Sequence, residues 1–123
     1  MNKYSNRYSS RFFRAFVYAG RGLLHFIRHD RNGKLHLFAA LLVTIGGFYF
    51  QIPVAQWTTL LLCFGLVIGL EMCNHALESL CDLVQPEPHP LIKIAKDVAA
   101  GAVLWAAIIS LVIGLLIFIP YLT

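Results

Sequence analysis

The sequence predicts an all-α integral membrane protein in which an N-terminal amphipathic surface helix precedes three membrane-spanning helices. Hydrophobic residues make up 59% of the 123 residues and charged residues only 13%, whereas soluble domains carry about 25% charged residues. Three long segments with few charges follow a basic N-terminal region. A chain of this length fits one domain, which we expect to cover residues 1–123.

The surface helix is expected over about residues 11–28, where apolar and basic residues alternate at helical spacing. The apolar positions are Phe12, Phe13, Phe16, Val17, Leu23, Leu24, Phe26 and Ile27, and the basic positions are Arg11, Arg14, Arg21 and Arg28. A basic amphipathic helix of this kind lies in the plane of the membrane. The alternative is a helix that packs on the spans without touching lipid.

The three spans are expected at about residues 35–52, 57–84 and 98–119, because a span needs about 20 apolar residues. The first run is apolar apart from His36 and Gln51, and the second reaches full length only with its polar end included. The third is uncharged and ends at Pro120. The proline-rich segment 85–90 cannot form regular helix, and it separates the second span from a short helix that starts at Leu91.

The placement of basic residues predicts a cytoplasmic N-terminus and an external C-terminus. Positive charge collects in cytoplasmic loops, and the turn over residues 51–56 carries none. The loop between the second and third spans carries Lys93 and Lys96. The basic residues before the first span are Lys3, Arg7, Arg11, Arg14, Arg21, Arg28, Arg31 and Lys34. The membrane surface explains this charge, and no nucleic-acid partner is expected.

The second span ends in a polar stripe formed by Glu71, Asn74, Glu78 and Asp82. On a helix, Glu78 and Asp82 each lie within about 20° of Glu71. Glu71 is about 21 Å along the helix from Trp57, which places it in the cytoplasmic half of hydrocarbon about 30 Å thick. An ionisable residue at this depth points to function. The alternative is a buried, hydrogen-bonded carboxyl group that holds helices together.

The stripe favours a magnesium-dependent phosphoryl transfer. Carboxylate, amide and water oxygens suit Mg²⁺, with phosphate completing the shell. Five of the six acidic residues lie between Glu71 and Asp97, at the cytoplasmic level of the membrane. Magnesium, phosphate and a buried carboxylate base are what phosphoryl transfer requires. The sequence contains no P-loop motif, so helix ends, the loop and basic side chains would hold a nucleotide.

A non-enzymatic membrane protein, such as a helper subunit with a buried polar helix contact, is the competing interpretation. It explains the spans and their orientation equally well. It does not explain why the acidic stripe, the charged loop and the Lys96-Asp97 pair lie at one level of the membrane.

Specific motifs connect this pattern to a known family. They are Glu71-x-x-Asn74-x-Ala76-Leu77-Glu78-x-x-x-Asp82, Glu87-x-His89-x-Leu91, Lys96-Asp97-x-Ala99-Ala100-x-Ala102-Val103-Leu104, Arg11, Arg14, Tyr18, Arg21-Gly22-Leu23 and Asp30-x-Asn32-x-x-x-His36. Over nearly its whole length the sequence resembles the small bacterial membrane kinases of the diacylglycerol kinase and undecaprenol kinase family. The resemblance implies a multi-pass homotrimer of the bacterial inner membrane, with active sites shared between neighbouring chains.

The resemblance also implies a reaction and its residues. An ATP- and Mg²⁺-dependent kinase would phosphorylate the hydroxyl of a membrane lipid, either diacylglycerol or undecaprenol. Glu71 would be the general base and Asn74 would orient it, while Glu78 and Asp30 would hold the magnesium ion of ATP. The nucleotide would also contact Arg11, Tyr18, Glu87, His89, Lys96 and Asp97, and Asp82 would support that face. Two positions depart from the family pattern: Asp30, where glutamate is usual, and His75, where serine or threonine is usual.

Overall fold

The computed structural model describes the backbone of residues 3–123 and the side chains of residues 7–123. Four helices follow one another: α1 (Lys3–His29), α2 (Arg31–Tyr49), α3 (Val54–Val84) and α4 (Pro90–Leu122). The described residues contain no strand, which confirms the all-α class. The chain divides into two compact units, one ending at Asp30 and the other covering Arg31–Thr123.

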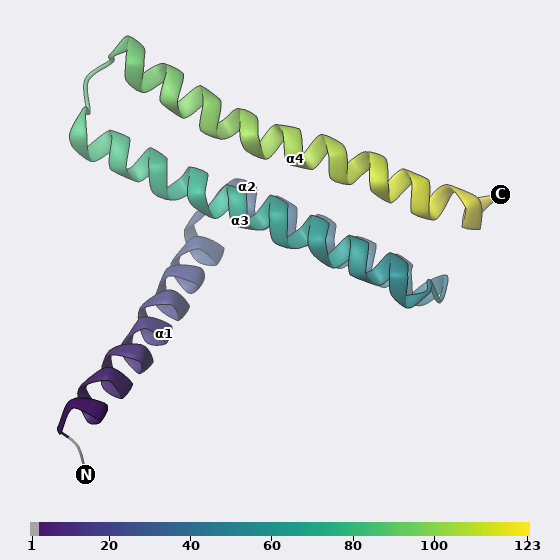
Figure 1. Ribbon diagram of the computed structural model, residues 1–123. Coiled ribbons are helices and arrows are strands. Elements are labelled where there is room, and N and C mark those ends of the chain that lie inside the picture. The colour runs from purple at the N-terminus through teal and green to yellow at the C-terminus, as the bar shows by residue number, and fades with distance from the viewer. Residues whose placement is uncertain (1–2) are drawn as a thin grey trace. The chain divides into compact units, whose positions relative to one another are not determined.

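Helix α1 is one continuous amphipathic helix (Figure 1). It begins at Lys3 rather than near residue 11, because the preceding polar residues contain neither proline nor glycine to stop it. Large aromatic side chains are exposed along it, among them Phe12 and Phe16, whose rings meet edge to face at 5.1 Å. The last turn closes where the Asp30 amide donates to the Phe26 carbonyl oxygen at 2.9 Å.

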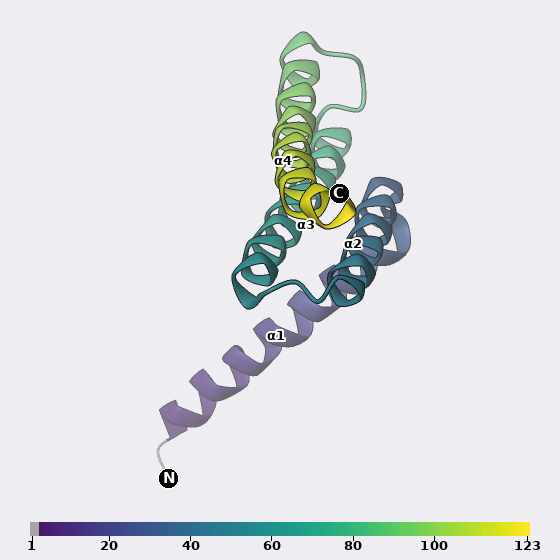
Figure 2. The same ribbon diagram turned by 90° about the vertical axis from the view of Figure 1, so that its right-hand side faces the viewer.

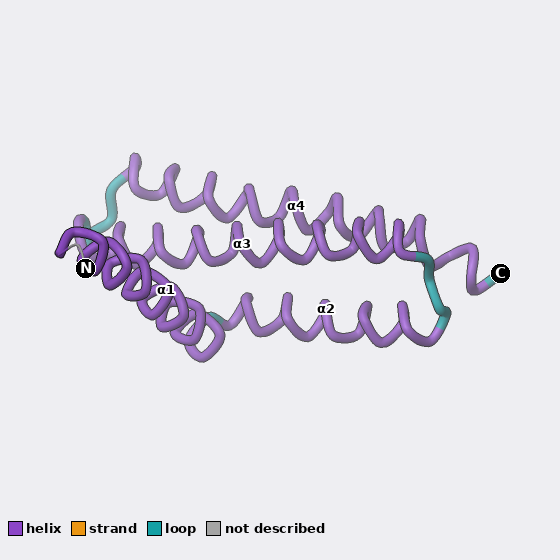
Figure 3. The backbone as a smooth tube through the Cα atoms, turned by 60° about the horizontal axis from the view of Figure 1, so that its bottom comes forward, coloured by secondary structure: helices purple, strands orange, loops and turns teal. Residues whose placement is uncertain are grey.

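In the second unit, α3 packs against both α2 and α4 (Figures 1 and 3). Short connections make consecutive helices antiparallel, so the turn after α2 and the C-terminus lie at one end of this bundle. The loop between α3 and α4 lies at the other end, as Figures 1 and 2 show. At the first end, the Tyr121 hydroxyl donates to the Gln56 side-chain oxygen at 2.9 Å.

By length and composition, α3 and α4 are the described helices that could cross a membrane. Their 31 and 33 residues correspond to lengths of about 46 and 50 Å, compared with hydrocarbon about 30 Å thick. Each helix therefore projects beyond the hydrocarbon. Helix α2 does not qualify by the same measure, because the polar residues of its first turns, among them Asn32, Lys34 and His36, lower its mean hydropathy.

Helix α4 is longer than the sequence suggested, since it runs without interruption from Pro90 instead of forming a short helix and a separate span. Its start is well defined: the His89 ring nitrogen Nδ1 accepts a hydrogen bond from the Leu91 amide at 3.1 Å, and Pro90 occupies the first turn. Pro120 does not end the helix, which continues to Leu122. Because Pro120 has no N–H, the last turn lacks the backbone hydrogen bond that this position would otherwise donate to the Leu116 carbonyl oxygen.

The turn after α2 is closed by two backbone hydrogen bonds. The Gln51 amide donates to the Phe48 carbonyl oxygen at 3.3 Å, and the Ile52 amide donates to the Gly47 carbonyl oxygen at 3.1 Å, the pattern of a Schellman motif. Gln51 takes the left-handed conformation with φ of 51°, which glycine usually occupies. Ile52 then turns inward and forms a buried cluster with Leu60 and Ile117.

Gly47 allows α2 and α3 to approach closely beside this turn. A Cβ atom at Gly47 would lie 2.5 and 2.7 Å from two ring atoms of Trp57, and 3.2 Å from the Ile52 side chain. The Trp57 ring also packs on Phe48, with centroids 4.9 Å apart. This contact fixes how α2 sits on α3 at the turn end of the bundle.

We predict that Gly47→Ala destabilises the protein by about 1–2 kcal/mol, because the clash with Trp57 outweighs the gain in helix propensity. Gly65→Ala is the matched control, since nothing lies within 4 Å of a Cβ atom there. Thermal unfolding in detergent measures both variants. A Gly47→Ala protein as stable as Gly65→Ala would contradict the close approach.

Candidate active site

The polar stripe on α3 changes from buried to exposed along the helix. Glu71 and Asn74 are 2% and 6% exposed, whereas Glu78 is exposed and the Asp82 side chain is 68% exposed. Seven and eleven residues after Glu71 bring the helix back to nearly the same face. One face of α3 thus leads from the bundle interior to the end that holds the loop between α3 and α4.

Asn74 links the buried and exposed parts of this stripe. Its side-chain nitrogen Nδ2 donates to Glu78 Oε1 at 3.3 Å. Its side-chain oxygen Oδ1 is buried and has no hydrogen-bond partner among the residues that the structure describes. A buried amide oxygen without a partner is energetically unfavourable. This oxygen, with the Glu78 carboxylate beside it, is therefore suited to receive a bound ion or its water.

Helix α2 contributes His36 to the surroundings of Glu71. The His36 ring nitrogen Nε2 lies 4.0 Å from Glu71 Oε2, which is beyond direct hydrogen-bond distance. Sequence reasoning assigned no role to His36, although it is a polar residue within the apolar run 35–52. That isolated polarity is the signal that could have identified it.

At the loop end, five of the predicted site residues line one cleft of about 820 Å³: Asp82, Glu87, His89, Lys96 and Asp97. A cleft of this size can hold a ligand as large as a nucleotide. Lys93 also lines it, although sequence reasoning used this residue only for the orientation. Its position one helical turn before Asp97 is the signal that could have placed it there.

Two ion pairs organise the charges of the cleft. The Lys96 ammonium donates to Asp82 Oδ1 at 2.5 Å, joining α4 to α3, and Lys93 donates to Asp97 Oδ2 at 2.6 Å within α4. The hydrogen bond to Asp82 raises the pKa of Lys96 above its ordinary value, because the carboxylate stabilises the charged ammonium group. The wall of the cleft thus presents two ammonium groups suited to phosphate.

The remaining predicted residues belong to the unit that ends at Asp30. Arg11 and Tyr18 are exposed on α1, and the Arg21 guanidinium lies over the Tyr18 ring at 5.9 Å from its centroid. Asp30 occupies the break between α1 and α2. Within the described residues, no three His, Cys, Asp or Glu side chains form a metal-binding group. Magnesium bound to a nucleotide needs only one or two protein carboxylates.

The chain is similar to known proteins over most of its length. Residues 17–118 match the family described as prokaryotic diacylglycerol kinase. The chain is 46% identical over 111 residues to an undecaprenol kinase of Bacillus subtilis, covering 90% of each protein. It is 38% identical over 107 residues to a diacylglycerol kinase of Synechocystis sp., covering 86% of this chain and 61% of the relative. A diacylglycerol kinase of Helicobacter pylori is 29% identical over 103 residues, covering 80% of each protein.

Proposed function

The chain belongs to the prokaryotic diacylglycerol kinase family, which makes it a membrane lipid kinase, and we propose that it transfers the γ-phosphoryl group of ATP to a lipid hydroxyl with the help of Mg²⁺. The observation that carries this proposal is the arrangement along α3. A buried carboxylate, Glu71, lies on the same helix face as Glu78 and Asp82, which approach a cleft lined by Lys93 and Lys96.

In this reaction the lipid hydroxyl oxygen attacks the γ-phosphorus, the bond from that phosphorus to the β–γ bridging oxygen breaks, and ADP leaves. The hydroxyl proton passes to the Glu71 carboxylate. Glu71 is 2% exposed, so bulk water has little access to this carboxylate. Such catalysis consists mainly of positioning and charge stabilisation, which the fixed side chains of α3 and α4 supply.

The Glu78 carboxylate and the Asn74 side-chain oxygen fit a magnesium ion by their chemistry, and Asp30 is the second carboxylate that we propose. When bound, magnesium neutralises charge that develops on the phosphate oxygens. Lys93 and Lys96 would contact phosphate from the cleft wall, with Asp82 holding Lys96 in place. Glu87, His89 and Asp97 would contact the rest of the nucleotide, together with Arg11 and Tyr18 of α1.

We propose that the membrane arrangement has three spans, α2, α3 and α4, with α1 on the inner surface of the bacterial inner membrane. Large apolar side chains are exposed on all three helices, for example Leu42, Leu62 and Leu116, and lipid or neighbouring chains would cover them. We also propose a homotrimer, as the family resemblance implies, because neighbouring chains would cover these apolar faces. Reporter fusions at Gln56 and at the C-terminus should both be external, and cross-linking in native membranes should give trimers. An internal fusion or monomers alone would contradict this arrangement.

The lipid acceptor is tested directly with purified protein and labelled ATP. Diacylglycerol and undecaprenol are supplied separately in the same detergent, with and without magnesium. Transfer of label to either lipid supports the proposed function. ATP use that does not respond to any lipid would contradict it and would favour a non-enzymatic protein.

We predict that Glu71→Gln loses about 10² to 10⁴ in turnover, because glutamine keeps the shape of the side chain but cannot accept the hydroxyl proton. Helix content and nucleotide binding should be retained, as circular dichroism and a nucleotide-binding assay would show. Turnover within a few-fold of wild type would remove Glu71 from the base role, and Asp97 would be tested next.

We predict that Glu78→Gln raises the magnesium concentration needed for half-maximal activity, because one carboxylate ligand is lost. Ser79→Ala is the matched control, since the Ser79 hydroxyl is exposed and bonds to the His75 carbonyl oxygen of its own helix. A magnesium titration of activity compares the two variants. Identical titration curves for wild type and Glu78→Gln would contradict the ligand assignment.

A further inference from the structure

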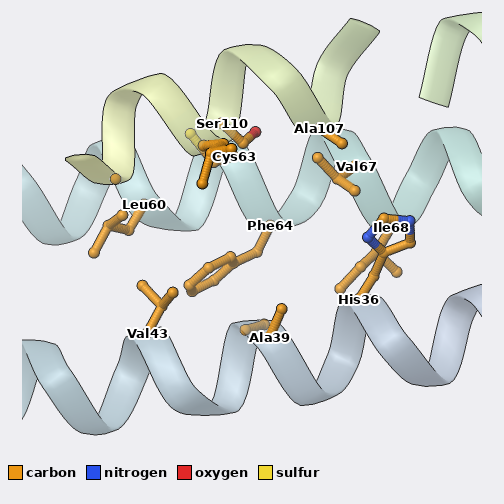
Figure 4. A pocket seen from close by; sticks show the side chains of 13 residues that line it. His36, Ala39, Val43, Leu60, Cys63, Phe64, Val67, Ile68, Ala107 and Ser110 are labelled. Carbon is orange, nitrogen blue, oxygen red and sulfur yellow. The ribbon is translucent and has the colours of Figure 1, made fainter. Parts of the chain in front are cut away.

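An apolar cavity of about 250 Å³ lies among α2, α3 and α4. Figure 4 shows side chains from all three helices pointing into it, with His36 at one end and Val43 and Leu60 toward the other. Its lining is apolar except for His36 and Ser110. An apolar lining of this kind favours hydrocarbon groups over water.

His36 connects this cavity to Glu71. It lines the cavity, and its ring nitrogen Nε2 lies 4.0 Å from Glu71 Oε2. The polar end of the cavity therefore adjoins the carboxylate to which we assign the base role. A molecule with its hydroxyl at Glu71 would find an apolar space immediately beside it.

The distance between the two side chains fits one inserted oxygen atom. At 4.0 Å the two atoms are too far apart for a direct hydrogen bond. A single oxygen can lie about 2.8 Å from both of them. With a proton on His36 Nε2, the ring donates to one lone pair of that oxygen. The hydroxyl proton then points to Glu71, and the second lone pair remains for attack on phosphorus.

We propose that His36 binds the acceptor hydroxyl opposite Glu71, and that the hydrocarbon next to this hydroxyl occupies the cavity among α2, α3 and α4. This inference rests on the proposed kinase function. In the transfer step the bound oxygen forms its bond to the γ-phosphorus, ADP leaves with the bridging oxygen, and the proton moves to Glu71. The cavity is smaller than most sites for drug-sized ligands, which measure about 300–1,000 Å³, so the rest of the lipid chain extends into the bilayer.

The first experiment measures kcat/KM for lipid and KM for ATP in His36→Ala and His36→Gln, with whichever of undecaprenol and long-chain diacylglycerol the wild type phosphorylates. His36→Ala should lower kcat/KM for lipid about tenfold, the effect of one lost hydrogen bond, without changing KM for ATP. The Gln side chain keeps a donor near the position of Nε2, so His36→Gln should recover to within about threefold of wild type.

The outcomes separate this inference from the proposed function. If the wild type phosphorylates neither lipid, the kinase proposal fails, and the inference fails with it. If the wild type is active and His36→Ala matches it, only the inference fails. If kcat/KM for lipid is no higher in His36→Gln than in His36→Ala, the proposed hydrogen bond to the acceptor is likewise overturned. Circular dichroism checks that both variants are folded.

The second experiment fills the cavity. Ala107→Leu places a larger side chain inside it, and Ala55→Leu, an exposed alanine of α3, is the matched control. Ala107→Leu should raise KM for the lipid acceptor several-fold while leaving KM for ATP unchanged, because the larger side chain takes up space that the hydrocarbon next to the hydroxyl needs. No change in KM for the lipid, or an equal rise in KM for ATP, would overturn the cavity assignment. Ala39→Val repeats the test from α2 if Ala107→Leu does not fold.

Discussion

Burial of the Glu71 carboxylate among apolar helices is the constraint on which the rest of the bundle depends. A charged carboxylate at the centre of a membrane costs on the order of 2.5–3.5 kcal/mol on insertion scales, and Glu71 is 2% exposed. Such a group persists only where neighbouring polar atoms offset its desolvation. Here α2 brings the His36 ring within 4.0 Å, and the rest of the acidic stripe lies progressively nearer the loop end of α3.

Because side-chain exposure increases along α3, the same helix presents a buried carboxylate at Glu71 and a solvent-exposed one at Asp82. The buried part of the stripe adjoins the apolar cavity at His36, while Asp82 and Lys96 meet in an open cleft at the loop end. In the proposed reaction, the lipid hydroxyl would approach from the apolar side and the nucleotide from the open cleft. Because both environments are built on the same straight helix, their separation is set by helix rise.

The far end of the bundle supports this geometry without taking part in the chemistry. Gly47 lets Trp57 pack directly against α2, and the turn through Gln51 directs Ile52 into the buried cluster. Helix α2 is continuous from this turn back to His36, so the contact at Gly47 helps to determine where the His36 ring lies. A glycine at one end of the helix therefore affects the surroundings of Glu71 at the other.

The sequence alone determined the helical class, the approximate positions of the long apolar helices and the acidic stripe, because hydrophobic period and helix rise are local properties. Tertiary structure decided the contacts between helices, which the hydrophobic pattern of the sequence does not specify. The proximity of His36 to Glu71, the Asp82–Lys96 pair and the cavity all depend on how antiparallel helices are aligned. That alignment follows from contacts between helices, such as Gly47 with Trp57. These atoms meet only after the chain has turned, so the spacing of residues along one helix does not specify the alignment.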